Sequence, residues 1–577
     1  MRKLQGNGCA EGMAAGRVLL KRAIQPSQLE RPAGTPEEEL RLLDESLDLL
    51  QAQLDTLYDK TLAESGEDAA ELIESYQMIA LDSALFGAVR AEIQDGRSAP
   101  SALRHVCEQQ KAVFAAMDDP YMQERYTDIE AVLQELTGLC CGVQGALTSV
   151  ELCEPTIVVA DTLTPVDTVK LDKNYLRGFV TETGGATSHA VILARTLGIP
   201  AIVGIAGITE LAENGEHICV NGASGEILLS PDRASRAEFE AAAAAYRKSA
   251  ARYEKEPLGP VLTKDGARML LAVNSGDSDT ASTLSPEVCD GVGLFRTEFL
   301  YMKQEGYPSE EALFSAYRDA VQKMDGKPFI FRTLDIGGDK ALGYMNLPVE
   351  ENPFLGYRAV RICLDRPELF RTQLRALLRA SAYGAVQIMF PMITCLDELL
   401  RCLAQLDEAR KELDAEGVPY RKDIPVGIMV ETPAAVMVLD QLAPHVDFFS
   451  VGTNDLVQYL MAADRGNPKL QGLYNPFQIS VLRALRHIGA VAKEYGVALG
   501  VCGETASSLP MVPFLIGCGV TELSVAASAL PKLRFLVRRL DQGACRELAV
   551  KAASLSNAEE AEALLRRFAD AHMEDLP

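Results

Sequence analysis

The sequence predicts a multidomain α/β protein whose carboxyl-terminal half is a TIM (β/α)8 barrel. At 577 residues the chain is long enough for about three or four domains of ordinary size. The pattern of the sequence changes along the chain, from helical periodicity to short strands and then to strands that alternate with helices. Beyond Val261, eight strand-like segments occur within about 300 residues, which is the repeat count of such a barrel.

The first 230 residues predict an α/β domain that carries a helical insert at about 35–142. From Pro36 to Leu139, leucines recur at intervals of three and four residues, as on one face of a helix: Leu40, Leu43, Leu47, Leu50, Leu54 and Leu57. Between Pro155 and Ser230, Gly, Pro and Asn separate short β-type runs: TIVVA, GFVTET, PAIVG, HICV and EILLS. A helical bundle inserted into an α/β domain accounts for both patterns.

Residues 231–258 predict a linker helix. The segment RASRAEFEAAAAAYRKSAARYEKE combines alanines with charges of both signs, which favours a long solvated helix, and Pro257, Gly259 and Pro260 end it. A helix packed in a bundle has a similar composition and remains an alternative. Residues 259–577 then form the barrel.

Polar side chains come at or just after the carboxyl ends of most predicted barrel strands. The eight strand segments are MLLAVNS, GVGLFRTEF, FIFRTLDIG, AVQIMFPMI, PVGIMVET, VDFFSVGTND, ALGVCGE and ELSVA. The polar residues at their ends are Arg296, Arg332, Glu431, Asn454, Asp455, Cys502 and Glu504. Barrel enzymes build their active sites at this end of the strands, so the sequence predicts a site there.

Three arginines of this set indicate an anionic ligand. Arg296, Arg332 and Arg465 come from separate segments, and the carboxylates of those segments are too few to neutralise all three. Guanidinium groups bind carboxylate and phosphate through paired hydrogen bonds, so a small molecule with both groups fits them best. Ordinary salt bridges are the alternative for each arginine taken singly.

Glu431 and Asp455 predict a metal site. Two carboxylates that leave positions for water and substrate oxygens suit Mg²⁺, and Mn²⁺ prefers similar ligands. A different interpretation of the same stretch is that Thr453 or Asn454 caps a helix and that Asp464 and Arg465 form a surface pair.

Cys502 and His189 are the candidates for chemistry. A thiol at the position of Cys502 could donate a proton to carbon, although a buried cysteine is often inert. In TGGATSHAVILAR two glycines open a turn, Thr187 or Ser188 can cap, and His189 begins a helix. Backbone N–H groups there would hold a phosphoryl group carried by the imidazole, whereas a structural histidine is the alternative.

Composition excludes several other classes of protein. The formal net charge of −25 argues against a nucleic-acid partner. No apolar run reaches the length of a membrane-spanning helix, and the amino terminus lacks the pattern of a signal peptide. Thirteen cysteines without a CxxC motif predict reduced thiols in the cytoplasm.

Six motifs resemble those of Enzyme I of the phosphoenolpyruvate-dependent sugar phosphotransferase system: GGATSHAVILAR, LFRTEFLYM, IFRTLDIGGDK, ENPFLGYRAVR, SVGTNDLVQY and VCGE. The resemblance extends over nearly the whole chain. It implies a swivelling phosphohistidine domain and a Mg²⁺-dependent cytoplasmic homodimer that associates through the barrel. Such an enzyme moves the phosphoryl group of phosphoenolpyruvate to its own histidine and then to the carrier protein HPr, releasing pyruvate.

The resemblance also implies roles for single residues. His189 would become the phosphohistidine, Glu431 and Asp455 would hold Mg²⁺, and Cys502 would protonate the enolate of pyruvate. Five residues would bind phosphoenolpyruvate: Arg296, Arg332, Asn454, Asp455 and Arg465. Lys340 and Arg358 are weaker candidates for further contacts with the anion.

The helical insert is where the family docks HPr. Its acidic residues Glu67, Asp68 and Glu71 could meet a basic patch on the carrier, with Met78 as an apolar contact. A solvated acidic face is the alternative. Hinges at Pro231 and Pro257 would let the first domain swing between the barrel and the carrier.

The sequence departs from the family pattern at three places. Ala10, Glu11 and Gly12 replace Ser-Pro-Gly, and Tyr76 stands where the bundle usually has His. After Cys502 the usual Glu-Met-Ala-Gly becomes Glu504–Ser507, reading ETAS. The altered loop leaves a second hypothesis open, a regulatory protein that senses phosphoenolpyruvate and turns over poorly.

Relatives with additional domains fit the sequence less well. Pyruvate phosphate dikinase and phosphoenolpyruvate synthase need a large ATP-grasp domain, for which we find no room, and no P-loop is present. The nitrogen-branch paralogue carries a sensory domain before the bundle, and here the bundle is expected to begin within about 35 residues.

Overall fold

The structure is a computed structural model that separates into two compact units, Met1–Ser249 and Ala250–Pro577. It describes residues 1–21, 33–65, 67–115, 120–142, 152–163, 167, 171, 174–184, 189–276, 285–302, 306–338, 342–465, 467–470 and 472–573. None of the helices described within these ranges combines the length and the apolar character needed to cross a bilayer.

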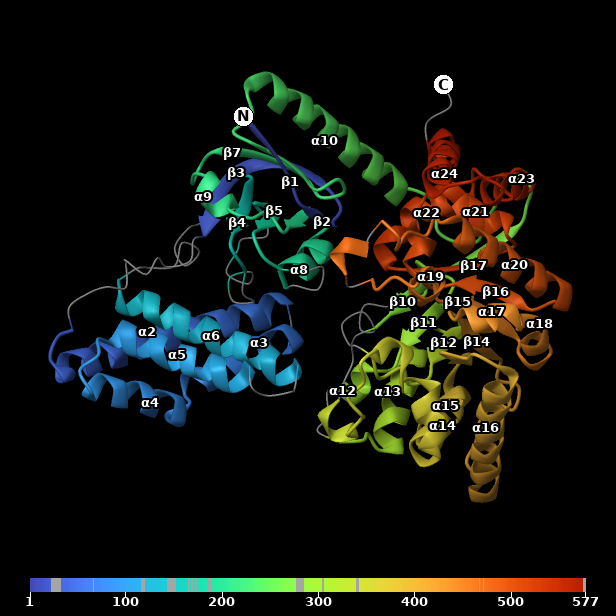
Figure 1. Cartoon of the computed structure of the whole chain (residues 1–577), viewed down its shortest axis with the longest axis horizontal. Coiled ribbons are helices and arrows are strands. Elements are labelled where there is room, and N and C mark those ends of the chain that lie inside the picture. Colours follow the sequence, from blue (N-terminus) through green and yellow to red (C-terminus); the bar gives the residue numbers. More distant parts are fainter. Residues whose placement is uncertain are drawn as a thin grey trace. The chain divides into compact units, whose positions relative to one another are not determined.

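The second unit contains a closed barrel of eight parallel strands, β10 to β17 (Figure 1). Each strand pairs with the next along the chain, and β10 closes the ring by pairing with both β11 and β17. The strands are β10 (Arg268–Ser275), β11 (Val292–Arg296), β12 (Phe329–Arg332), β13 (Val386–Phe390), β14 (Val426–Val430), β15 (Phe448–Val451), β16 (Ala498–Val501) and β17 (Glu522–Val525). Every predicted strand segment coincides with one of them to within a few residues, so the predicted TIM barrel is confirmed. A short strand, β9 (Val261–Leu262), pairs antiparallel with β10.

Side chains along each barrel strand point alternately toward the surrounding helices and into the barrel, so the unit has an outer core and an interior cluster. In β12, Phe329 and Phe331 belong to the large core between strands and helices, whereas Ile330 belongs to a small interior cluster. The helices around the barrel are α12 (Phe299–Met302), α13 (Glu310–Gln322), α14 (Val360–Asp365), α15 (Pro367–Ala380), α16 (Leu396–Glu416), α17 (Pro433–Met437), α18 (Leu439–Leu442), α19 (Thr453–Met461), α20 (Ile479–Tyr495), α21 (Met511–Gly517), α22 (Leu530–Val537), α23 (Gln542–Ala553) and α24 (Ala558–Met573).

The first unit contains a mixed sheet with the strand order β1-β8-β7-β3-β4-β5-β6-β2. Its strands are β1 (Arg2–Gln5), β2 (Asn7–Ala10), β3 (Met13–Lys21), β4 (Thr156–Ala160), β5 (Leu176–Thr181), β6 (Ala201–Val203), β7 (His217–Asn221) and β8 (Glu226–Leu229). The five predicted runs all form strands. The three amino-terminal strands were not among them, and β3 lies in the middle of the sheet between β4 and β7. Two helices accompany the sheet, α8 (His189–Leu197) and α9 (Ile208–Leu211).

The helical insert is a bundle whose helices lie side by side in Figure 1. Its members are α2 (Pro36–Ser65), α3 (Glu67–Ala80), α4 (Ser83–Gln94), α5 (Ala99–Ala115) and α6 (Pro120–Cys140). Leu43, Leu50 and Leu54 are buried in its core, and Leu40 and Leu47 pack against them. The predicted leucine stripe is therefore the buried face of α2, while the side chain of Leu57 lies outside the described residues.

Helix α10 (Arg233–Glu254) follows the first sheet. Near its start, Phe239 and Ala243 are buried against Cys219 and Leu228 of the sheet. At its end, the ring of Tyr253 meets Phe535 of α22 at 5.0 Å between centroids. The start of the helix thus packs within Met1–Ser249, and its end packs within Ala250–Pro577. The hinges expected at Pro231 and Pro257 stay a prediction.

Candidate active site

Side chains along a strand point alternately outward and inward, and several of the predicted barrel residues occupy positions in the inward series. Arg296, Arg332 and Glu431 each follow, by two residues, an apolar side chain of the interior cluster, and Cys502 is itself a member of that cluster. The cluster consists of Leu294, Ile330, Met389, Met429, Phe448 and Cys502. The register of β11 and β12 makes Arg296 and Arg332 direct neighbours. The strands thus bring two guanidinium groups, a carboxylate and a thiol to the carboxyl end of one barrel.

Arg332 is buried and paired with two carboxylates. Its Nη2 donates to Oε1 of Glu298 at 2.9 Å, and its Nη1 lies 2.8 Å from Oδ2 of Asp335. Burial alone would lower the pKa of Arg332, but Asp335 and Glu298 raise it above its usual value. Arg332 taken singly therefore forms the salt bridges that were the alternative to a ligand contact, whereas the expectation of too few carboxylates concerned the three arginines together. The buried Nε of Arg332 has no hydrogen-bond partner within the described residues and remains a donor for a ligand.

Arg296 and Arg465 are more accessible. Arg296 is exposed, and within the described part of the chain it makes no hydrogen bond or ion pair. Nη1 of Arg465 lies 3.4 Å from Oδ1 of Asp455, and its guanidinium carbon lies 5.3 Å from the ring centre of Phe354. These two side chains present the positive charge that an incoming anion would meet first.

Glu431 and Asp455 are both buried, and they fit a divalent cation. Oε1 of Glu431 accepts a hydrogen bond from the backbone N–H of Met392 at 2.6 Å. Burial, Asp455 and Asp335 together raise the pKa of the Glu431 carboxyl well above its usual value, although Arg332 and Arg358 oppose the shift. A cation would offset the repulsion between the two carboxylates.

The protein supplies only part of a coordination shell at this point. No group of three or more His, Cys, Asp or Glu side chains in the described ranges is arranged to hold a metal. Mg²⁺ is commonly held by one or two carboxylates, and its other coordination positions are filled by water and substrate oxygens. The residues present are therefore compatible with a divalent cation that takes its remaining ligands from outside this pair of carboxylates.

Asn454 connects the site to the altered loop. Its Oδ1 accepts a hydrogen bond from the backbone N–H of Glu504 at 3.1 Å, and the loop forms a 3₁₀ turn over Glu504–Ser507. The alternative in which Thr453 or Asn454 caps a helix is not observed, because Gly452 is the N-cap of α19 and no side chain caps it. Asn454 thus holds the loop that follows Cys502.

Cys502 is a buried, protonated thiol. It is 3% exposed, and its Sγ donates to the carbonyl oxygen of Val451 at 3.7 Å. Burial raises the pKa of Cys502 to about 11, so the thiol keeps its proton at neutral pH. A protonated thiol at the mouth of an apolar interior is suited to donate a proton rather than to act as a nucleophile.

We expect Cys502 to react with iodoacetamide much more slowly than the exposed Cys153 and Cys395. At pH 8 a thiol with a pKa of about 11 is ionised in about one molecule in a thousand, and only the thiolate reacts. Mass spectrometry of digested, time-sampled protein would give the three rates. The Cys502 rate should rise about tenfold per pH unit up to pH 10. Equal rates at pH 8 would contradict the assignment of a protonated thiol.

His189 lies in the other unit, at the position where α8 begins. Gly184 precedes it with a positive φ of 116°, as the predicted glycine turn requires. The capping residues Thr187 and Ser188 and the imidazole of His189 lie outside what the structure describes. The seven predicted barrel residues therefore come together in one unit, while the predicted phosphate acceptor belongs to the other.

Two buried carboxylates of the site were not predicted. Glu298 and Asp335 follow Arg296 and Arg332 by two and three residues, in the motifs LFRTEF and IFRTLD. A carboxylate shortly after an arginine at a strand end was the signal that could have identified them. Arg358 contacts Asp335 and Asp455, whereas Lys340 falls outside the described residues.

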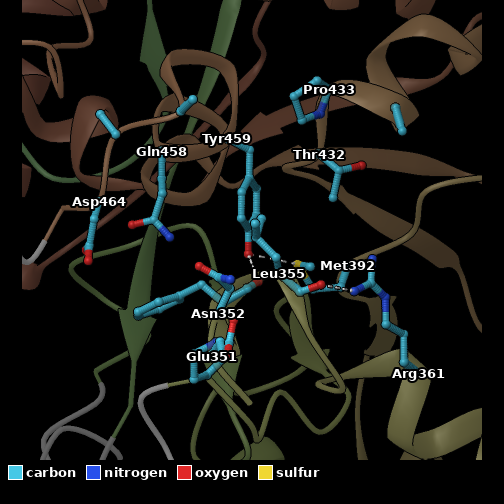
Figure 2. A pocket seen from close by; sticks show the side chains of 15 residues that line it. Glu351, Asn352, Leu355, Arg361, Met392, Thr432, Pro433, Gln458, Tyr459 and Asp464 are labelled. Atoms are coloured by element: carbon cyan, nitrogen blue, oxygen red, sulfur yellow. Dashed lines mark hydrogen bonds between the residues drawn. The ribbon is translucent and has the colours of Figure 1, made fainter.

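A cavity of about 630 Å³ borders the site (Figure 2). Its wall includes Met392 and Thr432, which lie beside Glu431, and Tyr459 of α19. The hydroxyl of Tyr459 donates to the carbonyl oxygen of Phe354 at 2.5 Å and accepts from Nη1 of Arg358 at 3.1 Å. None of the predicted site residues lines the cavity, so it is a neighbour of the site rather than the site itself.

Comparisons with known proteins agree with this architecture. Three models of the PEP-utilising enzymes match the chain, for the N-terminal domain at residues 5–125, the mobile domain at 152–225 and the PEP-binding domain at 250–542. The phosphoenolpyruvate-protein phosphotransferase of Lactococcus lactis subsp. cremoris is 41% identical over 98% of this chain and 99% of its own length. The phosphoenolpyruvate-protein phosphotransferase of Bacillus subtilis is 38% identical over 98% of this chain and 99% of its own length.

These matches extend over both units and include the strands that carry the arginines, the carboxylates and the thiol. The chain therefore belongs to the PEP-utilising enzyme family and, within it, to the phosphoenolpyruvate-protein phosphotransferases.

Proposed function

We propose that this protein transfers the phosphoryl group of phosphoenolpyruvate to His189 and then to a histidine of the carrier HPr, releasing pyruvate. The observation that carries the proposal is the composition of the barrel site. Arg296 and Arg332 are neighbours, Glu431 and Asp455 are buried close by, and Cys502 is a protonated thiol at the same strand ends. Each of these groups meets one requirement of the reaction.

The anionic groups of phosphoenolpyruvate suit the arginines. The exposed Arg296 and the remaining donor of Arg332 would bind the phosphate and the carboxylate, with Arg465 and Asn454 beside them. Glu431 and Asp455 would hold Mg²⁺, with Mn²⁺ as a substitute, and the ion would neutralise charge on the transferring phosphoryl group.

The reaction breaks the bond between phosphorus and the enol oxygen and forms one between phosphorus and an imidazole nitrogen of His189. The electron pair of the broken bond stays on the departing enolate. The thiol proton of Cys502 then passes to the methylene carbon, which gives pyruvate and a thiolate that water reprotonates. Proton donation of this kind typically contributes about 10² to 10⁴ in rate.

The acceptor HPr is proposed to dock on the bundle. The side chains of Glu67, Asp68 and Glu71 lie outside the described residues, but Met78 on α3 is 69% exposed and available as an apolar contact. Tyr76 is 2% exposed and its hydroxyl donates to Oδ1 of Asp128 at 3.2 Å. Because Tyr76 is buried, its difference from the family histidine would act through the bundle core rather than by direct contact.

The proposal includes a homodimer formed through the barrel unit and a cytoplasmic location. Exposed apolar side chains of the barrel unit support the dimer, among them Leu355 at the cavity, 66% exposed, and Met437 of α17, 77% exposed. The thirteen cysteines include no CxxC motif, a pattern that fits a reducing compartment.

The test is to incubate the protein with Mg²⁺ and phosphoenolpyruvate labelled in its phosphate, with and without HPr. We expect one acid-labile, base-stable phosphate per chain, pyruvate in equal amount, and passage of the label to HPr. Binding of phosphoenolpyruvate without any label on either protein would contradict the proposal. That result would favour the hypothesis of a regulatory protein that senses phosphoenolpyruvate.

A further inference from the structure

A chain of buried ion pairs joins the substrate arginine to the metal carboxylate. It runs from Glu298 through Arg332, Asp335 and Arg358 to Asp455, and we call it the ion-pair chain. Its four links measure 2.9, 2.8, 2.8 and 3.4 Å. The proposed function assigns Arg332 to the substrate and Asp455 to the metal, so Glu298, Asp335 and Arg358 would act through these two residues.

Asp335 is the central member of the ion-pair chain. It is 2% exposed, its Oδ2 lies against Arg332 and its Oδ1 accepts from Nη2 of Arg358. Its backbone N–H donates to Oε1 of Glu298 at 3.1 Å, the same oxygen that Arg332 contacts. One carboxylate therefore orients two guanidinium groups that would otherwise repel each other at short range.

Arg358 is shared between two carboxylates. Its Nη2 lies 2.8 Å from Asp335 but 3.4 Å from Oδ2 of Asp455, so the contact with Asp335 is the closer one. A cation bound by Asp455 would compete with Arg358 for the same oxygen. If Asp335 lost its charge, Asp455 would be the one carboxylate paired with Arg358 among the described residues, beside the hydroxyl of Tyr459 and the ring of Phe354.

We propose that Asp335 is a positioning residue that sets the metal affinity of Asp455 by holding Arg358 back, while it orients Arg332 for the substrate. This inference rests on the proposed function, because it takes Arg332 as a substrate contact and Asp455 as a metal ligand. The inference adds that Asp335 couples the orientation of Arg332 to the metal affinity of Asp455. Outer-shell partners of metal ligands commonly change metal affinity by about 10-fold to 100-fold when they are replaced.

The test measures Mn²⁺ binding to the full-length protein by electron paramagnetic resonance, without phosphoenolpyruvate. Asp335→Asn keeps the shape and removes the charge, and it should weaken Mn²⁺ binding by about 10-fold or more. Arg358→Met removes the competing cation, and it should tighten Mn²⁺ binding several-fold. General damage to the site would weaken binding in both variants, so the opposite signs are specific to the proposal.

Two control variants separate this coupling from simpler effects. Glu298→Gln removes one charge from Arg332 but leaves Arg358 on Asp335, so it should raise the KM for phosphoenolpyruvate and leave Mn²⁺ affinity within about threefold. Glu310→Gln breaks a similar bridge outside the site, where Glu310 joins Arg375 at 2.6 Å and Arg379 at 2.7 Å. It should change neither quantity.

Unchanged Mn²⁺ affinity in Asp335→Asn, or equal weakening in Asp335→Asn and Glu298→Gln, would overturn the inference. If Asp335→Asn does not fold, the sign of the change in Arg358→Met decides alone. A wild-type protein that takes no label from phosphoenolpyruvate would refute the proposed function and this inference together. Normal labelling of the wild type with unchanged Mn²⁺ binding in Asp335→Asn would refute only this inference.

Discussion

His189→Ala is expected to take no phosphate from phosphoenolpyruvate, whatever the concentration of Mg²⁺ or the time of incubation. The predicted residues of the barrel site carry thiol, carboxylate, amide and guanidinium groups but no imidazole, so none of them can replace His189 as a phosphohistidine. The substitution should leave substrate binding intact, because His189 belongs to Met1–Ser249 and the barrel site to the other unit. Incubation with labelled phosphoenolpyruvate measures phosphorylation, and calorimetric titration with phosphoenolpyruvate measures substrate binding.

A histidine from the same unit supplies the control for this variant. His217 in β7 lies beside Arg236, whose Nη1 is 2.6 Å from its Nε2, and it has no role in the proposal. His217→Ala should therefore be labelled like the wild type. Label that persists in His189→Ala, or disappears equally in both variants, would remove His189 as the acceptor.

Glu431→Gln is expected to lower the rate of phosphorylation by Mg²⁺ and phosphoenolpyruvate by about 10³-fold. The amide keeps an oxygen that can accept from the N–H of Met392, so the local structure should survive. Its other end, however, presents a neutral group where the cation needs a carboxylate, and the charge stabilisation lost with the ion is worth several kcal/mol. Rapid-quench measurement of phosphohistidine at increasing Mg²⁺ would give the rate and its dependence on the metal.

Glu522→Gln is the matched control for Glu431→Gln. Glu522 begins β17, at the opposite end of the barrel strands from Glu431, and burial raises the pKa of Glu522 to about 7. Its replacement removes a comparable carboxylate without touching the proposed metal site. A similar loss of rate in both variants would show that the effect of Glu431→Gln comes from the fold and not from the metal.

The barrel was predictable because its pattern repeats. Each of the eight units shows a β-type apolar run followed by a helical stretch, and the polar residues fall at the same end of most runs. The strands β1 to β3 lack such a pattern. β1 and β2 have only four residues each, and Gly6 and Gly12 flank β2. The positions of all three strands in the sheet depend on partners more than 130 residues away, such as Thr156 opposite Arg17 of β3.

The residue types of the candidate site were also predictable, but their pairing was not. Arg332 comes at the carboxyl end of a predicted barrel strand, which the sequence shows. That it is neutralised by Glu298 depends on the register of β11 with β12 and on the turn after each strand. Register is set by packing against the rest of the barrel, so a single sequence contains no direct record of it.

The position of Cys502 has a stereochemical consequence. Its thiol belongs to the apolar cluster that fills the barrel, whereas Arg296, Arg332 and Glu431 each lie one inward position further along their strands. A planar enolate held by these charged groups would meet the thiol from one side only. Under the proposed function, protonation would then be facially selective. A single geometric isomer of phosphoenolpyruvate carrying deuterium and tritium at its methylene carbon would yield pyruvate with a chiral methyl group of one handedness.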